Sequence, residues 1–223
     1  TPVIENGKVN FQVTYELAAK AASILVDYTV HPSGQVDLKY VFEPLISGLS
    51  DIPRIGLSMI LPGDFKQVEW YGRGPLESYM DRKSGQKIGL WQGNIDSQFH
   101  RYSRPQETGN KTDVRWMQVA GNGLTILVKP LDGQLLNAST WPFDMRMLDY
   151  FPETDGSASA SGLVPVTTKH GAEIQIKDFV RWNIDHDQMG VGGDTSWGRQ
   201  VHEEYRLKPQ KYTYSFSIAP SVN

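Results

Sequence analysis

The residues that suggest chemistry most directly lie between Gly190 and Trp197, where a tryptophan follows a glycine-rich polar run. Gly190, Gly192 and Gly193 permit backbone angles that other residues avoid, and Asp194 can hydrogen-bond its own main chain to stiffen the turn. Such a loop can hold an indole ring rigidly in solvent. An exposed indole stacks well on the apolar C–H face of a pyranose ring. The run therefore predicts that Trp197 binds a sugar.

Carboxylates are the next candidates, since hydrolysis of a glycosidic bond uses two of them held roughly 5 to 10 Å apart. Four acids lie in conspicuous motifs, and each has an arginine close by in the sequence, which favours charge pairing that keeps the acids ionised and structural. We therefore expect no complete hydrolytic pair and assign no catalytic residue in this chain. The acids are Glu77, Asp81, Glu107 and Asp113, and the neighbouring arginines are Arg73, Arg82, Arg104 and Arg115.

Metal binding is not expected either. In the triplet Asp185, His186, Asp187, a strand would turn the two aspartates one way and the histidine the other. The remaining histidines lack the short spacings of zinc sites. Mutarotation of a sugar needs a general acid and a general base, and His170 or His186 with a glutamate is a conceivable pair that no motif supports.

Strand patterns dominate the elements that must position these residues. Polar and apolar residues alternate in Lys211 to Ile218, in Val36 to Phe42 and around Ile174 and Ile176. Turn signals separate the strand-like runs, for example at Pro62, Gly63, Asp64 and at Gly121, Asn122, Gly123. The pattern predicts an all-β antiparallel sandwich that forms a single domain over residues 1–223. Trp70, Trp116 and Trp182 are expected in its core, while Trp91 and Trp141 are undecided.

Helix is scarce, and long segments connect some strands. The alanine-rich piece Glu16 to Ala22 is predicted to form an irregular turn, and Glu153 to Gly162 a long surface loop. The long segments Gly72 to Asp113 and Pro142 to Gly162 are where binding surfaces form on such scaffolds.

Composition excludes several classes of protein. The formal net charge of -3 gives no electrostatic reason to expect nucleic acid as a partner, and no apolar run is long enough to cross a membrane. The absence of cysteine excludes disulfides and thiolate metal sites but leaves the compartment open, cytoplasmic or periplasmic. Because the chain opens on Thr1 without a signal segment, we expect a piece of a longer protein.

Three motifs carry a resemblance to a known family. Trp70 to Arg82 reads WYGRGPLESYMDR, Arg104 to Trp116 reads RPQETGNKTDVRW, and the third motif is the loop ending in Trp197. Together they resemble the C-terminal domain of glycoside hydrolase family 2 beta-galactosidases. The match extends from about Arg54 to the C-terminus.

The resemblance implies a galactose-mutarotase-like supersandwich that packs beside a TIM barrel of the same chain. In the family that barrel holds both catalytic glutamates and the Mg and Na ions, so no cofactor is expected in this piece. Trp197 alone matches a position that contacts substrate, stacking on the aglycone sugar at the mouth of the active site. The implied partners are a galactoside and the barrel, within a parent that forms a homo-oligomer.

Three other functions remain open from the sequence. An autonomous carbohydrate-binding module would bind galactosides by itself. An aldose epimerase-like domain would speed mutarotation, and a structural or assembly domain would do neither. The family resemblance favours a domain that is inactive alone and completes the substrate cleft of a beta-galactosidase.

Overall fold

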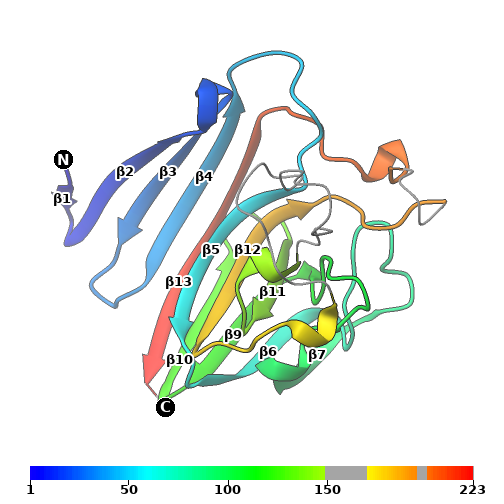
Figure 1. Cartoon of the computed structure of the whole chain (residues 1–223). Helices are drawn as coiled ribbons and strands as arrows, with labels where there is room; N and C mark the ends of the chain where they lie inside the picture. Colours follow the sequence, from blue (N-terminus) through cyan, green and yellow to red (C-terminus); the bar gives the residue numbers. More distant parts are fainter. Residues whose placement is uncertain (149–169, 195–199, 223) are drawn as a thin grey trace.

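The computed structural model describes residues 1–148, 170–194 and 200–222, which form two antiparallel β-sheets (Figure 1). The larger sheet has nine strands in the order β1 (Val3–Glu5), β2 (Lys8–Glu16), β3 (Ala22–Val30), β4 (Val36–Pro44), β13 (Tyr212–Val222), β10 (Leu124–Pro130), β9 (Trp116–Gly121), β6 (Phe65–Gly74) and β7 (Lys87–Asn94). The smaller has four, in the order β5 (Arg54–Pro62), β12 (Phe179–Gln188), β11 (Leu136–Trp141) and β8 (Lys111–Val114). The predicted all-β antiparallel supersandwich is confirmed.

The helices in the described ranges are single 3₁₀ turns. They are η1 (Ala18–Lys20), η2 (Ile95–Ser97), η3 (Met145–Leu148), η4 (Gly171–Glu173) and η5 (Glu203–Tyr205). Within those ranges no helix is long and apolar enough to span a bilayer. The irregular turn predicted at Glu16 to Ala22 is confirmed, because η1 contains Ala19 at a φ of 56°.

Alternation along the strands places the core between the two sheets. On β13, Tyr214 and Phe216 are buried, and on β4 Leu38 and Tyr40 are buried while Lys39 is exposed. The side chains of β12 pack against this face from the smaller sheet. A buried polar contact also joins the sheets, since the Tyr214 hydroxyl donates to the Ile184 carbonyl at 2.9 Å.

The tryptophans differ in burial according to their positions on the strands. Trp70 and Trp182 are buried as predicted, and Trp141, which the sequence left undecided, is buried too. Trp116 is only half-buried, so the core position predicted for it is wrong. It begins β9 beside Tyr71 of the neighbouring strand. Met117 and Val119 of β9 alternate into the core, so Trp116 lies on the face of the larger sheet that points away from the smaller one.

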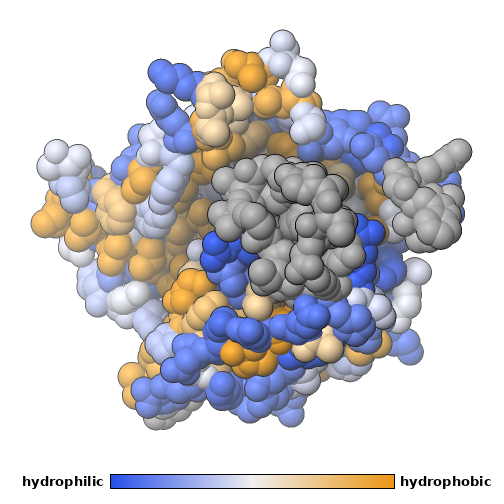
Figure 2. Space-filling view, in the orientation of Figure 1, coloured by the Kyte–Doolittle hydropathy of each residue, from blue (hydrophilic) through white to orange (hydrophobic). Residues whose placement is uncertain are grey.

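The larger sheet extends beyond the smaller one as a wing made of β1, β2 and β3, at the left of Figure 1. Apolar side chains on this wing are accordingly exposed, among them Ile4 at 75% and Tyr15 at 46%. Figure 2 shows hydrophobic surface gathered in the same region. The core therefore lies mainly beneath β4, β13, β10, β9 and β6, and it includes Ala22 and Val26 of β3.

One predicted strand does not form. Ile174 and Ile176 alternate with polar residues, but the segment is η4 followed by irregular chain, and Arg101 donates to the carbonyls of Gly171 and Ile174 at 2.9 and 2.8 Å. A side chain thus satisfies the backbone that a neighbouring strand would have paired. The loop predicted at Glu153 to Gly162 lies outside the described residues.

The hydrogen bond from the Tyr214 hydroxyl should contribute to the stability of the protein. Replacing Tyr214→Phe removes the hydroxyl and leaves the ring, so the free energy of unfolding should fall by about 1 to 2 kcal/mol through loss of a buried hydrogen bond. Urea unfolding measures this. The control is Tyr71→Phe, whose ring is 36% exposed and whose hydroxyl loss should cost less than about 0.5 kcal/mol. Equal effects would refute a role for the Tyr214 hydroxyl in joining the sheets.

Candidate functional site

The first two sequence motifs meet at the carboxylate of Glu77. One oxygen accepts from the Tyr102 hydroxyl and pairs with Arg82. The other accepts from the Thr108 hydroxyl at 3.0 Å and from the Gly109 amide at 2.7 Å. The side chain is 14% exposed, so these donors replace the water that a charged carboxylate would otherwise hold. Glu77 therefore ties the loop after β6 to the segment before β8.

These donors also decide the charge of Glu77. Burial by itself would raise its pKa, but the hydrogen bonds from Tyr102, Gly109 and Thr108, together with the charge of Arg82, lower the pKa below its ordinary value. The carboxylate is ionised, and both of its oxygens are occupied. This is the environment of a structural anion rather than of a general acid, which needs a raised pKa.

The second acid of the first motif, Asp81, contacts the third motif. Its carboxylate accepts hydrogen bonds from the backbone amides of Val191 at 3.2 Å and Gly192 at 2.6 Å. Gly190 donates its own amide to the Tyr205 carbonyl at 2.9 Å. A side chain at Gly190 would not fit, because its Cβ would lie 2.6 Å from the Asp81 carboxyl carbon. The first residues of the glycine-rich loop are thus held in one position.

Trp197, the predicted sugar-binding residue, lies outside the described residues. Its contact with a sugar stays a prediction.

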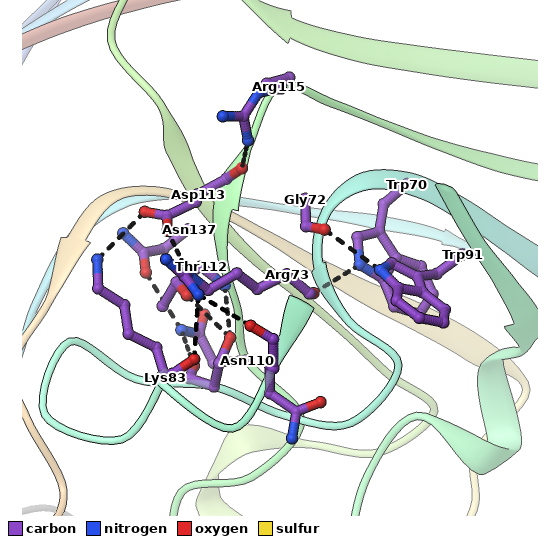
Figure 3. Close-up of polar contacts among 12 residues, drawn as sticks. Trp70, Gly72, Arg73, Lys83, Trp91, Asn110, Thr112, Asp113, Arg115 and Asn137 are labelled. Atoms are coloured by element: carbon purple, nitrogen blue, oxygen red, sulfur yellow. Dashed lines mark hydrogen bonds and ion pairs between the residues drawn. The ribbon is translucent and has the colours of Figure 1, made fainter. Parts of the chain in front are cut away.

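Arg73 and Asp113 form the second junction between the first two motifs (Figure 3). The Arg73 guanidinium pairs with Asp113 and also donates to the carbonyls of Lys83 and Gln86, at 3.2 and 2.8 Å. Lys83 adds a second ion pair to Asp113 at 3.3 Å. Hydrogen bonds and charges from Arg73 and Lys83 outweigh burial and lower the pKa of Asp113. The loop between β6 and β7 is thereby fixed against β8.

Glycine in the first motif is needed for packing around two tryptophans. Trp70 and Trp91 are cross-strand neighbours, and their indole nitrogens donate to the carbonyls of Arg73 and Gly72 at 2.9 and 3.3 Å (Figure 3). A Cβ on Gly74 would lie 2.6 Å from the Trp91 ring. The glycines of this motif serve close packing.

A third junction is buried and centres on Arg54. Its guanidinium lies 3.0 Å from Asp185 and 3.1 Å from Glu107, and donates to Gln188 at 3.1 Å. Burial raises the pKa of Asp185 to about 7 against the opposing charge of Arg54, and it raises the pKa of Glu107 as well. The guanidinium also lies 5.1 Å from the centre of the Trp141 ring.

The predicted pairing of acids with nearby arginines is therefore correct for Glu77 and Asp113 and wrong in detail for the other two. Glu107 pairs with Arg54 because the register of β5 against β12 brings Arg54 beside Gln188, far from its place in the sequence. Asp81 binds backbone amides instead of a guanidinium.

The triplet on β12 is separated by a register shift between Asp185 and Asp187. Asp185 faces Arg54, while Asp187 accepts from Asn137 at 3.4 Å. The His186 ring packs on Tyr214, with ring centres 5.6 Å apart. Across the described ranges, no three His, Asp or Glu side chains are grouped so that they could hold a metal ion.

Sequence reasoning missed three residues that organise this region, namely Arg54, Tyr102 and Lys111. Arg54 and Tyr102 carry no local signal, since their partners are distant in the sequence. Lys111 lies in the second motif and could have been noticed there. It is 3% exposed, and its Nζ lies 5.0 Å from the centre of the Trp70 ring.

The environment of Glu77 predicts a specific pH dependence. Because its folded pKa lies below the ordinary 4.5, its stabilisation is present above that pH and is lost as the pH falls through the folded pKa. Glu77→Gln should lower the free energy of unfolding by about 2 kcal/mol at pH 7 and by much less at pH 3. Urea unfolding across that range measures the difference.

The matched control is Glu69→Gln, a half-buried glutamate that accepts one side-chain hydrogen bond, from Gln118 at 2.6 Å. At pH 7, Glu69→Gln should lower the free energy of unfolding by less than Glu77→Gln does. A Glu77→Gln variant as stable as the wild type at pH 7 would contradict the argument.

Asp81→Asn should loosen the first residues of the glycine-rich loop, because the amide that replaces one oxygen cannot accept a hydrogen bond. Hydrogen exchange at the backbone amides of Val191 and Gly192 should accelerate roughly 10- to 100-fold. Asp132→Asn is the control, since Asp132 accepts from the Gln134 amide in a distant turn at 3.1 Å. Unchanged exchange in Asp81→Asn would show that these contacts do not hold the loop.

Comparison with known proteins identifies the family of this chain. The model for the beta galactosidase small chain matches residues 3–218. The chain is 35% identical over 213 residues to a beta-galactosidase of Priestia megaterium, covering 93% of this chain and 19% of that protein. It is 32% identical over 217 residues to a beta-galactosidase of Halalkalibacterium halodurans, covering 95% and 20%. The chain thus spans about a fifth of the length of the curated relatives it matches.

Solved structures resemble the chain more distantly. A GalM/aldose epimerase homologue from C. elegans aligns with 100% of this chain and 68% of its own, at a TM-score of 0.43 and 9% identity. A galactose mutarotase related enzyme from Lactobacillus acidophilus aligns with 98% and 69%, at a TM-score of 0.41 and 9% identity. Similarity at this level carries no argument about function. The family match covers almost the whole chain, and the protein belongs to the beta galactosidase small chain family.

Proposed function

We propose that this chain is the part of a glycoside hydrolase family 2 beta-galactosidase that forms one wall of the substrate cleft. In this proposal Trp197 stacks on the sugar, and the two catalytic carboxylates belong to a TIM barrel elsewhere in the same protein. The family match and the names of the relatives support the galactosidase assignment. The chain's share of their length supports its role as one part of a larger enzyme.

The observation that carries the proposal is the attachment of the glycine-rich loop by Asp81. Two charge-assisted hydrogen bonds to Val191 and Gly192 fix the chain only a few residues before Trp197. A preorganised loop loses little conformational entropy when a ligand binds. This favours a loop whose tryptophan is presented to a substrate in a defined orientation.

The motif carboxylates support a catalytic pair outside this chain. A retaining glycosidase needs one carboxylic acid with a raised pKa and one free carboxylate nucleophile about 5 Å away. Glu77 and Asp113 have lowered pKa values and are occupied by donors. Glu107, whose pKa burial raises, is tied to Arg54. These acids hold loops together.

The mechanism proposed for this chain is positional. The indole of Trp197 would contact the apolar face of the aglycone sugar, and so orient the glycosidic bond toward the carboxylates of the barrel. The Mg and Na ions implied by the family would be bound by the barrel as well. Homo-oligomers of the parent are part of the same proposal.

Trp197→Ala in the full-length enzyme should raise KM for lactose about tenfold, since a stacked aromatic contributes about 1.5 kcal/mol. The value of kcat should change less, because the carboxylates are untouched. Steady-state kinetics measure both. Trp197→Phe keeps a flat ring and should raise KM by a smaller factor. An unchanged KM in Trp197→Ala would overturn the proposed contact.

A further inference from the structure

The loops fixed by Glu77 and Arg73 surround an open cleft whose use the proposed function does not explain. Its volume is about 620 Å³, which is within the range of small-molecule sites. Strands β6, β7 and β8 and the loops between them form its walls. Its lining includes Trp70, Glu77, Gln86, Gln92, Gln98 and Lys111.

Lys111 lines the cleft and is 97% buried, being 3% exposed. Its Nζ lies over the Trp70 ring, and no residue in the described ranges accepts a hydrogen bond from it or forms an ion pair with it. Lys83, by contrast, pairs with Asp113. Three donor hydrogens at the wall of the cleft are therefore available, which is unusual for a buried lysine.

The charges around Lys111 do not cancel its own. Glu77 is the acid whose charge reaches it, but the Glu77 oxygens are occupied by Arg82, Tyr102, Thr108 and Gly109. Glu77 and Arg82 offset one another, which leaves the cleft with one excess positive charge. Burial lowers the pKa of Lys111 to about 8, while Glu77 opposes that shift, so the amine is mostly protonated at pH 7.

Three glutamine amides line the same cleft and have hydrogen-bonding capacity to spare. Gln86 accepts from the Leu76 amide at 3.1 Å, and neither of its donor hydrogens is used by a described residue. Gln98 donates to the Asn94 carbonyl at 3.2 Å and to the Ser97 hydroxyl at 3.3 Å, and no described residue donates to its acceptor oxygen. Gln92, on β7, forms no side-chain hydrogen bond within the described part of the chain. Amides with free donors and acceptors complement hydroxyl groups, which both donate and accept.

We propose that this cleft is a binding site for a sugar acid, a monosaccharide that carries a carboxylate beside its hydroxyls. The carboxylate binds the ammonium group of Lys111, and the hydroxyls bind the amides of Gln86, Gln92 and Gln98. An ion pair between ligand and Lys111 compensates a buried charge that the described residues leave unpaired. The residues that form this site do not include the glycine-rich loop, and the site's existence does not depend on the proposed stacking contact.

The test uses the full-length protein that contains this chain and D-galacturonate as the probe, with binding followed by saturation-transfer NMR at pH 7. Lys111→Met keeps an unbranched apolar side chain one atom shorter and removes the charge, and it should weaken galacturonate binding at least tenfold. Lys111→Arg keeps the charge and should stay within about threefold of the wild type. Neutral D-galactose should show no dependence on Lys111→Met of that size.

Two further measurements separate this site from a merely structural lysine. Galacturonate affinity of the wild type should fall as the pH rises through about 8, the pKa of Lys111, because the amine loses its charge, and Lys111→Arg should abolish this fall. Gln92→Ala, an exposed position whose loss leaves the fold intact, should weaken binding severalfold even if Lys111→Met fails to fold.

These measurements test the Lys111 cleft independently of the Trp197 contact. No galacturonate binding to the wild type, or equal binding to the wild type and the folded Lys111→Met or Gln92→Ala variant, overturns the proposal. Trp197→Ala should leave galacturonate affinity unchanged, and Lys111→Met should leave KM for lactose unchanged. Failure of the stacking contact and failure of this cleft are thus distinguishable.

Discussion

A buried carboxylate that must be satisfied is the constraint on which the arrangement of loops depends. Glu77 is largely removed from water, and an ionised group in that position is stable only when donors surround it. The donors come from Tyr102, Thr108 and Gly109, which follow Glu77 by 25 or more residues. Satisfying one charge therefore closes two long loops onto each other. The cleft beside Lys111 follows from that closure.

The same use of charge extends from the sheets outward to the glycine-rich loop. Arg54 fixes Glu107 and Asp185 inside the sandwich, Arg73 fixes Asp113 at its rim, and Asp81 fixes backbone amides beyond it. Glu107 and the loop amides held by Asp81 lie outside the sheets, so these contacts order chain that no strand pairing holds. The motif residues thus hold the loops in fixed positions against the sheets.

An alternating sequence predicted a strand correctly where a neighbouring strand pairs with it. The alternation in Tyr212 to Ile218 and in Val36 to Phe42 forms β13 and β4, neighbours in the larger sheet. The alternation at Ile174 and Ile176 is equally regular, yet it forms no strand because Arg101 takes the carbonyls of that segment. Alternation of polar and apolar residues indicates a segment with one buried face. The segment becomes a strand only when its backbone hydrogen-bonds to a neighbouring strand.

The sequence by itself determined the fold class, the turns and the family, because alternation, glycine positions and motif spacing are local properties of the chain. Tertiary structure decided which partner each charge has. Arg54 reaches Glu107 and Asp185 through the register of β5 on β12, and Lys111 loses its water because β8, at the edge of the smaller sheet, places its amine over Trp70 of the larger sheet. Burial and pairing depend on residues far apart in sequence, so no local pattern records them.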